Sequence, residues 1–523
     1  MTDLGMDQGG DGPHTVGRWL ADRAAAAPDR TAIDDRGVTI GYADLDDRAR
    51  ELALRLRRAG YGPGDRLATI SGNSIDHVVV FFACARAGVA FVPLSWRLAP
   101  RELGEALDRS DPALVLVEDE YVGVAAEALR RLAVRPPVAL LGTTEIEAAV
   151  PAKHGPAAPL RPVRDDDPLL VIYTSGSESA PKGVVLSHAN CFWNNLALAG
   201  AMQLTADDVV LAMLPQFHVA AWNVQPLLAW WVGATVVLER SFQPSRVLQL
   251  IAERGVTAMM GVPTQCRQLA DDPRFSGSAL RSLRVALVGG ATMPLDLATA
   301  WADAGVPLTQ GYGLTEAAPN VLFLPGAEAL RHPGAVGRPY PHVDVCVVDP
   351  ATLLPLDGAA TGELWVRGPS VFSGYLHDED ATARARHGEW LRTGDIVHRG
   401  ADGVFTIVDR LKDIYISGGE NVAPAEVERA MRLHPGVADA AVVGVPDPVW
   451  GERGVAFVVR RQGVALGEDE VLAHARAELA GFKVPVRIGF LDELPRSTID
   501  KIARAALRER AIALIQEDAH ERR

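Results

Sequence analysis

The chain has 523 residues, and its 48% hydrophobic and 23% charged residues are typical of a globular protein with two or more domains. Acidic residues outnumber basic ones by 66 to 52, and the formal charge of -14 disfavours nucleic acids and anionic membranes as partners. The same charge does not attract anionic small molecules either, so a site for one has to create its own local positive field.

Four cysteines are far apart and form no C-x-x-C pair, which argues against zinc or a disulfide framework and is typical of a reducing cytosol: Cys84, Cys191, Cys266 and Cys346. Residues 1–14 are acidic and glycine-rich and have no signal-peptide pattern, so we expect a disordered tail. Apolar runs such as 227–238 are shorter than the about 20 residues that span a bilayer. We therefore expect a cytoplasmic protein without a membrane span.

Taken in chain order, helical and strand patterns alternate through the first 300 residues. Helical periodicity over 15–60 ends at a Gly/Pro turn, and strands and helices then alternate at 66–70, 78–87, 90–93, 102–109 and 114–117. After a surface connection at 143–167, the alternation returns in strands 209–214, 234–238 and 284–288 and helices 225–231 and 244–253. This alternation predicts parallel sheets in an α/β architecture.

The sequence pattern changes in the last third of the chain. From about 335 to 410, short strands with frequent turns, such as 343–348, 362–367 and 403–408, predict a small β-rich subdomain. From about 413 a compact α+β region runs to Leu507 and ends in a charged helix.

The stretch from Tyr173 to Val184 reads Y-T-S-G-S-E-S-A-P-K-G-V between two short apolar strands. Backbone N–H groups and hydroxyls can donate to phosphate oxygens, and Lys182 supplies a point charge. It is not a Walker A loop, because Pro181 and Gly183 break that pattern and a strand follows instead of a helix. By itself the stretch predicts either a polyphosphate loop or a plain Ser/Gly hairpin.

Two later stretches also carry groups suited to a nucleotide. Gln310 to Glu316 places two glycines and a tyrosine before Thr315-Glu316, so the backbone can approach a flat ring and Glu316 could hold Mg²⁺. A tight turn is the alternative for this stretch. Thr393-Gly394-Asp395 exposes a carboxylate at a turn, where it could accept from sugar hydroxyls.

Two C-terminal stretches complete the series. A charge run at 409–413, by itself a solvated loop, precedes Ile416 to Pro424, where Gly418-Gly419 leave a narrow gap for a thin chain. Leu494 to Ile502 places Lys501 on a turn, where a lone lysine is usually exposed.

In combination these stretches resemble the adenylate-forming superfamily of acyl-CoA synthetases, nonribosomal adenylation domains and firefly luciferase. The resemblance covers roughly residues 15–508. Its markers occur in the order of the family, at 173–184, Phe217-His218, Gly289-Gly290-Ala291, 310–316, 393–395, 409–424 and 495–501.

The resemblance implies an α/β fold with a large N-terminal domain of two α/β subdomains plus a small β-barrel, followed by a small mobile α+β C-terminal domain. It implies an AMP-binding domain over 15–411 and a mobile domain over 412–523, with the hinge at Lys412. The implied reaction joins a carboxylic acid and ATP into acyl-AMP with release of pyrophosphate. The C-terminal domain then rotates, and the acyl group passes to the thiol of CoA.

The resemblance also implies a role for each matching residue, with Mg²⁺ as cofactor and ATP and CoA as co-substrates. Lys501 would bridge carboxylate and α-phosphate oxygens, Glu316 would hold Mg²⁺, Thr315 would contact the α-phosphate, and His218 would act beside the acid. The implied ATP or AMP contacts are Thr174, Ser175, Gly176, Ser177, Lys182, Gly289, Gly290, Ala291, Gly311, Tyr312, Gly313, Asp395 and Arg410. Gly418 and Gly419 would line the CoA tunnel. The implied acyl pocket contains Ala220, Ala221, Trp222 and Asn223.

Local details favour a stand-alone acid–CoA ligase. His218 stands where amino-acid-activating relatives have an aspartate for the substrate ammonium, and 416–424 and 482–485 resemble the acyl-CoA synthetase branch more closely. Few residues follow Lys501, so we expect no carrier domain. Ala220-Ala221 leave room beside Trp222, which predicts a medium, bulky or aromatic-like acid, unless Trp222 only packs in the core.

The alternatives are an enzyme that loads an acyl carrier protein or stops at the adenylate, and a degenerate nucleotide- or acyl-binding protein without turnover. The sequence is also compatible with a homodimer. The phosphate loop departs from the family, since Glu178 replaces a hydroxyl residue and Ser179 a glycine. A carboxylate 4 Å from a phosphate charge costs about 1 kcal/mol in water. Asp500 likewise replaces the glycine before Lys501, so these departures bear on ATP affinity rather than on reaction class.

Overall fold

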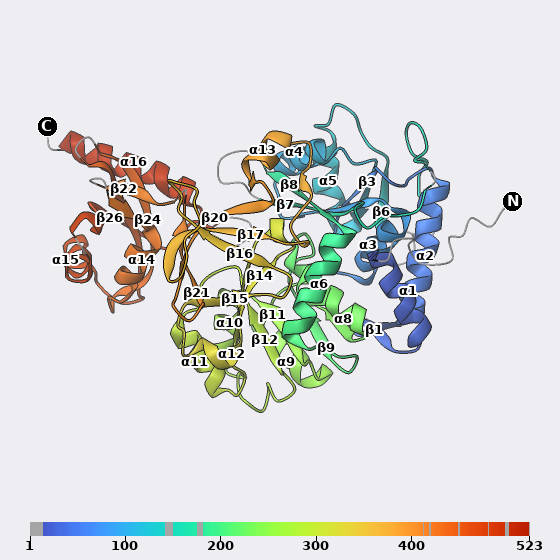
Figure 1. Ribbon diagram of the computed structural model, residues 1–523, viewed down its shortest axis with the longest axis horizontal. Coiled ribbons are helices and arrows are strands. Elements are labelled where there is room, and N and C mark those ends of the chain that lie inside the picture. The colour runs from blue at the N-terminus through green and yellow to red at the C-terminus, as the bar shows by residue number, and fades with distance from the viewer. Residues whose placement is uncertain are drawn as a thin grey trace. The chain divides into compact units, whose positions relative to one another are not determined.

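The computed structural model describes residues 14–141, 150–159, 161–174, 181–411, 413–417, 420–447, 450–479, 481–496 and 502–521 (Figure 1). The chain forms two compact units, one of Met1–Val345 with Trp365–Arg392 and one of Cys346–Leu364 with Thr393–Arg523. Of the expected disordered tail only His14 is described, and its Nδ1 lies 2.9 Å from Asp165 Oδ2. No described helix is long and apolar enough to cross a membrane.

The first unit contains a seven-stranded sheet in the order β18-β8-β7-β4-β3-β5-β6. The strands β3 to β7 are parallel, whereas β8 is antiparallel to β7 and β18 is antiparallel to β8. The predicted strands at 66–70, 90–93, 114–117 and 169–172 are confirmed, because each is a short apolar run that is buried in the sheet. The bounds are β3 (Arg66–Ile70), β4 (Ala90–Leu94), β5 (Leu114–Glu118), β6 (Val138–Leu141), β7 (Pro168–Thr174), β8 (Lys182–Ser187) and β18 (Gly374–Tyr375).

A second sheet of the first unit follows the order β15-β14-β13-β12-β11-β9-β10-β1-β2. It is parallel from β1 to β13, while β2, β14 and β15 are antiparallel to their neighbours. The bounds are β1 (Thr31–Asp35), β2 (Val38–Gly41), β9 (Val209–Ala212), β10 (Thr235–Leu238), β11 (Ala258–Gly261), β12 (Val285–Val288), β13 (Thr309–Gly313), β14 (Asn320–Leu324) and β15 (Ala335–Pro339).

The prediction of helical periodicity over 15–60 is confirmed at both ends of this range and wrong in its middle. The hairpin β1–β2 interrupts it between α1 (Val16–Ala26) and α2 (Tyr42–Arg58). Arg36 and Gly37 both adopt positive φ, 54° and 94°, which is the backbone geometry of a tight hairpin turn. Sequence periodicity missed it because each strand is only four or five residues long.

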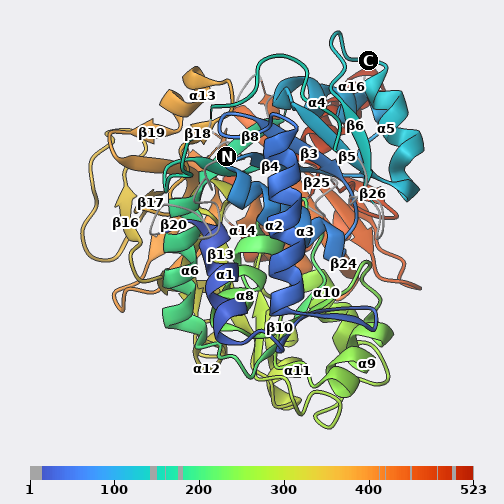
Figure 2. The same cartoon turned by 90° about the vertical axis from the view of Figure 1, so that its right-hand side faces the viewer.

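Helices pack between the two sheets of the first unit (Figure 2). The helix α3 (Ile75–Ala87) is mostly apolar, and all its residues except Asp76 and Arg86 are buried, as expected for a helix covered on nearly every side. It contacts β4 of the first sheet, and its Phe81 stacks on Trp222 of α7 (Ala220–Asn223) with ring centroids 4.5 Å apart. The neighbouring helices are α6 (His188–Met202) and α8 (Pro226–Val232).

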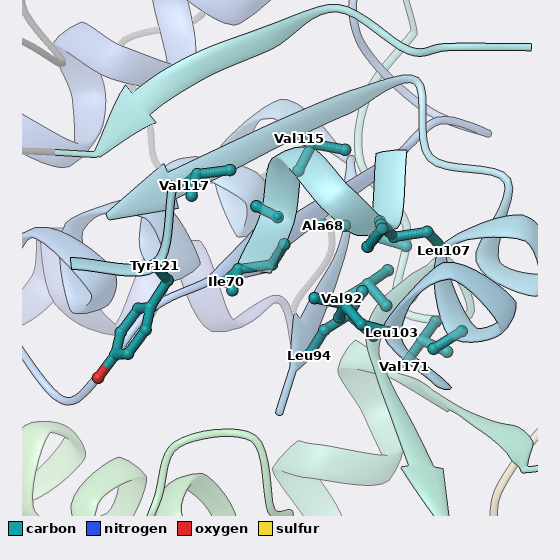
Figure 3. Close-up of a cluster of buried hydrophobic side chains, with 14 of the residues drawn as sticks. Ala68, Ile70, Val92, Leu94, Leu103, Leu107, Val115, Val117, Tyr121 and Val171 are labelled. Carbon is teal, nitrogen blue, oxygen red and sulfur yellow. The ribbon is translucent and has the colours of Figure 1, made fainter. Parts of the chain in front are cut away.

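The other helices of this unit cover the outer faces and edges. They are α4 (Pro100–Ser110), α5 (Val122–Leu129), α9 (Pro244–Arg254), α10 (Pro263–Ala270), α11 (Leu295–Asp303), α12 (Gly326–Ala329) and α13 (Glu379–Arg384), with short 3₁₀ turns η1 (Asp119–Tyr121) and η2 (Thr315–Ala317). On one face of the first sheet, Leu103 and Leu107 of α4 pack on Val92 of β4 and Val115 of β5 (Figure 3). This core fixes the strand ends from which the candidate site projects.

The predicted β-rich region contains β16 (Asp344–Val348), β17 (Ala360–Arg367), β20 (Trp390–Arg399) and β21 (Phe405–Arg410), paired in that order. The short strand β19 (Arg386–His387) pairs with Trp390 and Leu391 at the start of β20, within the first unit. The strands β16, β17 and β20 cross the boundary between the units. As far as the described residues extend, these strands form an open path and do not close into the expected barrel.

The C-terminal α+β region is also confirmed. Its sheet runs β23-β22-β25-β24, with β26 parallel to β25, and three helices pack against it. The bounds are β22 (Tyr415–Ser417), β23 (Glu420–Val422), α14 (Pro424–Arg432), β24 (Val437–Asp447), β25 (Gly451–Arg460), α15 (Glu468–Glu478), η3 (Gly481–Lys483), β26 (Arg487–Leu491) and α16 (Arg504–Glu521).

Candidate active site

The glycine-rich stretch joins two antiparallel neighbours, β7 and β8, with Thr174 opposite Lys182 and Tyr173 opposite Gly183. A plain hairpin and a phosphate loop would both have this topology. The residues around the base of the hairpin therefore have to distinguish the two predictions. Six of its residues, 175–180, lie outside the described residues, among them Ser175, Gly176, Ser177, Glu178 and Ser179.

The segment 372–376 binds this hairpin at its base. The backbone N–H groups of Ser373 and Leu376 donate to the carbonyls of Val185 and Gly183, at 2.9 and 2.7 Å. The N–H of Phe372 donates to the carbonyl of Glu316 at 2.8 Å. Through these bonds, the strand β18 connects the lysine-bearing strand β8 to the turn η2, which carries the predicted metal ligand.

The side chain of Tyr375 lies between two predicted site residues. Its hydroxyl donates to Glu316 Oε1 at 2.8 Å, and the Lys182 Nζ lies 5.1 Å from the centre of its ring. Burial, followed by the negative charge of Glu316 and the hydrogen bond to it, raises the pKa of Tyr375, so the phenol stays protonated and donates. Tyr375 was missed from the sequence, where the only signal is the preceding Gly374, whose φ of 155° brings the backbone against Thr382.

Buried asparagines hold the turn that carries Thr315 and Glu316. Asn223, predicted to lie in the acyl pocket, donates from Nδ2 to the carbonyl of Ala318 at 3.1 Å and is only 1% exposed. Asn194 of α6 donates to the carbonyl of Asn223 at 2.6 Å and accepts from the side-chain amide of Asn320 at 2.9 Å. Asn223 therefore supports the turn η2 as well as any pocket.

The glycine motifs at 289–291 and 311–313 meet at adjacent strand ends. A Cβ on Gly289 would lie 3.1 Å from the carbonyl oxygen of Gly311, and Gln310 Nε2 donates to the carbonyl of Ala291 at 3.3 Å. A Cβ on Gly313 would lie only 1.6 Å from the carbonyl oxygen of Pro319. The tight-turn alternative for this stretch is wrong, because Gly311, Tyr312 and Gly313 belong to the strand β13.

The loop with Phe217-His218 is anchored through Gln216, whose backbone N–H, backbone carbonyl and side-chain oxygen all form hydrogen bonds. Its N–H donates to Asn73 Oδ1 at 3.0 Å, its Oε1 pairs with His77 Nδ1 at 2.9 Å, and its carbonyl accepts from Trp222 Nε1 at 2.6 Å. His218 is half-buried, next to the ring of Phe217.

Trp222 is 0% exposed and packs against Phe81, His77 and Phe91. Trp222 therefore packs in the core, which was the alternative to a place in the acyl pocket. Its indole presents no surface to a ligand in this structure. Of the predicted pocket residues, Ala221 is also buried, whereas Ala220 is half-buried beside His218.

The burial of His77 predicts how the stability of the fold changes with pH. It is buried, it pairs with Thr69 Oγ1 at 2.8 Å as well as with Gln216, and burial lowers its pKa to about 4. In the unfolded chain a histidine takes up its proton near pH 6.5, so between pH 6.5 and 4 only the unfolded state is protonated. We therefore expect the free energy of unfolding to decrease as the pH falls through that window, with His77 contributing at most about 1.4 kcal/mol per pH unit.

Denaturant unfolding at several pH values measures this effect. The variant His77→Asn should be less stable at pH 7, because it loses packing, but its free energy of unfolding should fall less steeply between pH 6.5 and 4. His377→Asn is the matched control, since His377 is exposed and has a positive φ of 55° that asparagine tolerates. Equal slopes for His77→Asn and the wild-type chain would contradict the prediction.

In the second unit, the two predicted ribose contacts lie opposite each other on adjacent strands. Arg410 Nε lies 2.9 Å from Asp395 Oδ1, and Asp395 is 4% exposed. Gly394 has a φ of 69°, and its carbonyl accepts from the N–H of Leu411 at 2.8 Å, so glycine is required here. The turn predicted for Thr393-Gly394-Asp395 is wrong, because these residues lie within β20 and Asp395 is buried. The predicted residues Lys412, Gly418, Gly419 and Lys501, and the unusual Asp500, lie outside the described residues.

Comparison with known proteins agrees with this arrangement. The sequence matches the AMP-binding enzyme family over residues 20–376 and the AMP-binding enzyme C-terminal domain over residues 426–501. Feruloyl-CoA synthase from Amycolatopsis sp is 40% identical over 496 residues, which cover 95% of this chain and 99% of that protein. Indoleacetate–CoA ligase from Aromatoleum aromaticum is 36% identical over 501 residues, 94% of this chain and 98% of that protein.

The crystal structure of ATP-bound MatB from Rhodopseudomonas palustris superposes with a TM-score of 0.85 at 32% identity, covering 94% of this chain and 98% of that one. The large α/β unit with its smaller C-terminal part and the hairpin beside Glu316 define an adenylate-forming enzyme. The chain belongs to the family of AMP-binding enzymes, in its acid–CoA ligase branch.

Proposed function

We propose that the protein activates a bulky, aromatic-like carboxylic acid with ATP and transfers the acyl group to CoA. The observation that carries the proposal is the meeting of Lys182 and Glu316 at Tyr375, at the base of the hairpin. A cation and a carboxylate held beside a loop rich in hydroxyls and N–H groups can bind a polyphosphate and its metal ion.

In the first half-reaction, a carboxylate oxygen of the acid attacks the α-phosphorus of ATP, and pyrophosphate leaves. Lys182 and the hydroxyl and N–H groups of 174–177 hold the β- and γ-phosphates, and Thr315 contacts the α-phosphate. Lys501 neutralises the charge that develops where the new bond forms. Such a transfer depends on positioning and electrostatics more than on covalent help from the protein.

Glu316 fits a Mg²⁺ ion that is shared with ATP. Its Oε1 accepts from Tyr375, and its Oε2 accepts no hydrogen bond from any described residue, so that oxygen is available to a hard cation. The described residues contain no group of three or more His, Cys, Asp or Glu side chains that could hold a metal without the nucleotide. When bound, Mg²⁺ would neutralise phosphate charge and would draw its remaining ligands from phosphates and water.

In the second half-reaction, the thiol of CoA attacks the acyl carbonyl, and AMP leaves. We propose that residues 412–523 rotate about Lys412 after adenylation, which withdraws Lys501 and brings Gly418 and Gly419 to line the path of the pantetheine chain. Asp395 and Arg410 hold the ribose. One site then performs two reactions in sequence through a hinge motion.

Two observations support a bulky, aromatic-like acid as the substrate. The relatives named above are described as acting on ferulate and indoleacetate, both aromatic acids. In this chain, the small side chains Ala220 and Ala221 follow His218 and leave room for a bulky acyl group. We also propose a cytoplasmic location, because ATP and CoA are supplied there and all four cysteines are free thiols.

An acid panel tests the proposal. The protein is incubated with ATP, Mg²⁺, CoA and ferulate, indoleacetate, a medium-chain acid or acetate, and AMP and the thioester are measured by mass spectrometry. We expect acyl-CoA from the aromatic acids and much less from acetate. A thioester formed only on a holo carrier protein would make that the acceptor. Absence of pyrophosphate release with every acid would leave a binding protein without turnover.

The unusual phosphate loop yields a prediction about ATP affinity. Replacing Glu178 by Thr and Ser179 by Gly restores the family pattern and removes a negative charge from a loop that holds phosphates. We expect KM for ATP to fall several-fold, since a like-charge contact of about 1 kcal/mol is relieved, while KM for the acid stays unchanged. Initial-rate kinetics measure both constants. An unchanged KM for ATP would mean that Glu178 points away from the phosphates.

A further inference from the structure

We infer that Tyr375 is a positioning residue that keeps Lys182 and Glu316 apart and aimed at different parts of MgATP. In this role its ring directs the ammonium toward phosphate, and its hydroxyl turns the second carboxylate oxygen toward the metal. The inference rests on the proposed function and assigns a residue that the resemblance to known enzymes did not supply.

The backbone around Tyr375 is held by two neighbours, the strand β8 and the side chain of Thr382. Gly374 and Tyr375 pair with Val185 and Val184 of β8. The N–H of Tyr375 itself donates to Oγ1 of Thr382, a residue of α13, at 2.8 Å. Because each of these bonds involves the main chain, the backbone position from which the phenol ring projects is set by the fold and does not depend on a bound nucleotide.

The hydroxyl acts on one oxygen of Glu316 and leaves the other available. It donates to Oε1 at 2.8 Å, while the N–H of Phe372 binds the backbone carbonyl of the same residue at 2.8 Å. The backbone of Glu316 is therefore held by Phe372, and one oxygen of its carboxylate is held by Tyr375. A ligand that is oriented in this way by an outer hydrogen bond binds its metal more tightly than a freely rotating one.

The ring acts on Lys182. The ammonium lies 5.1 Å from the ring centre, within the range of a cation–π contact, and forms no ion pair with a carboxylate among the described residues. Without the ring between them, the lysine and the glutamate could form a salt bridge, which would neutralise the charges that phosphate and metal require. In this role, Tyr375 keeps Lys182 and Glu316 from forming a salt bridge with each other.

Two substitutions separate the two effects. Tyr375→Phe keeps the ring and removes the hydroxyl, whereas Tyr375→Leu removes both. Tyr340→Phe is the matched control, because Tyr340 is 2% exposed and its hydroxyl finds no hydrogen-bond partner in the described structure. The dissociation constant of ATP is measured by calorimetry on the full-length protein, once with EDTA and once with excess Mg²⁺, and thermal melting verifies the fold of each variant.

For Tyr375→Phe we expect an unchanged dissociation constant in EDTA and a rise of about 10-fold with Mg²⁺, the size typical of losing an outer partner of a metal ligand. Tyr375→Leu should weaken ATP binding in both conditions, and Tyr340→Phe in neither. Equal constants for Tyr375→Phe and wild type, or an equal loss in both conditions, would overturn the inference while the proposed function stands. A wild-type protein that binds no ATP would overturn the proposed function itself.

Discussion

Glu316→Gln is expected to lower acid-dependent ATP–pyrophosphate exchange by about 10²–10³-fold, the size typical of losing one electrostatic contact to a reacting phosphoryl group. Glutamine keeps the acceptor oxygen for the Tyr375 hydroxyl, which Glu316 Oε1 now provides at 2.8 Å, so the local structure should survive. What disappears is the negative charge that we propose attracts the metal ion. The loss should shrink as Mg²⁺ is raised, because the weakened site is then filled by mass action.

The matched control for this variant is Glu328→Gln. Glu328 lies on α12, and its carboxylate pairs with Arg338 at 3.0 Å, away from the hairpin and η2. It should retain wild-type exchange and the same Mg²⁺ dependence. If Glu316→Gln kept exchange within about threefold of wild type at limiting Mg²⁺, the metal ion would have to be held by other groups.

Lys501→Ala should separate the two half-reactions. Adenylation should fall by about 10²–10³-fold, because the variant lacks the cation that we propose neutralises the reacting oxygens. Transfer from presynthesised acyl-AMP to CoA should stay within a few-fold of wild type, because the proposed rotation has already withdrawn Lys501 by then. Pyrophosphate exchange measures the first step and thioester formation measures the second.

Lys483→Ala is the control in the same unit. Lys483 Nζ pairs with Glu426 at 2.7 Å on a partly exposed surface, so its loss should change either half-reaction little. Two results would contradict the assignment of Lys501: undiminished adenylation, or an equal loss in both half-reactions. The second result would point to a general defect of the C-terminal region.

The local elements of this protein are largely readable from its sequence, because apolar runs and helical periodicity are short-range properties. The strands β3, β4 and β5 and the helix α9 begin and end within a few residues of the predicted ranges. The hairpin β1–β2 was missed, since its strands are too short to show a period. The order of short motifs was sufficient for the family, which the comparisons then confirmed.

Only the tertiary structure decided which side chains meet. Tyr375 and Glu316 are 59 residues apart, and His77 and Gln216 are 139 apart, so no local pattern reports these contacts. Composition and spacing left open whether Trp222 lines a pocket or fills the core, and packing against Phe81 and His77 buried it. The sequence by itself determined the elements and the family, because these depend on residue type and local order. The pairing of Lys182 and Glu316 with Tyr375 depends on how β18 joins β8, which long-range strand pairing alone sets.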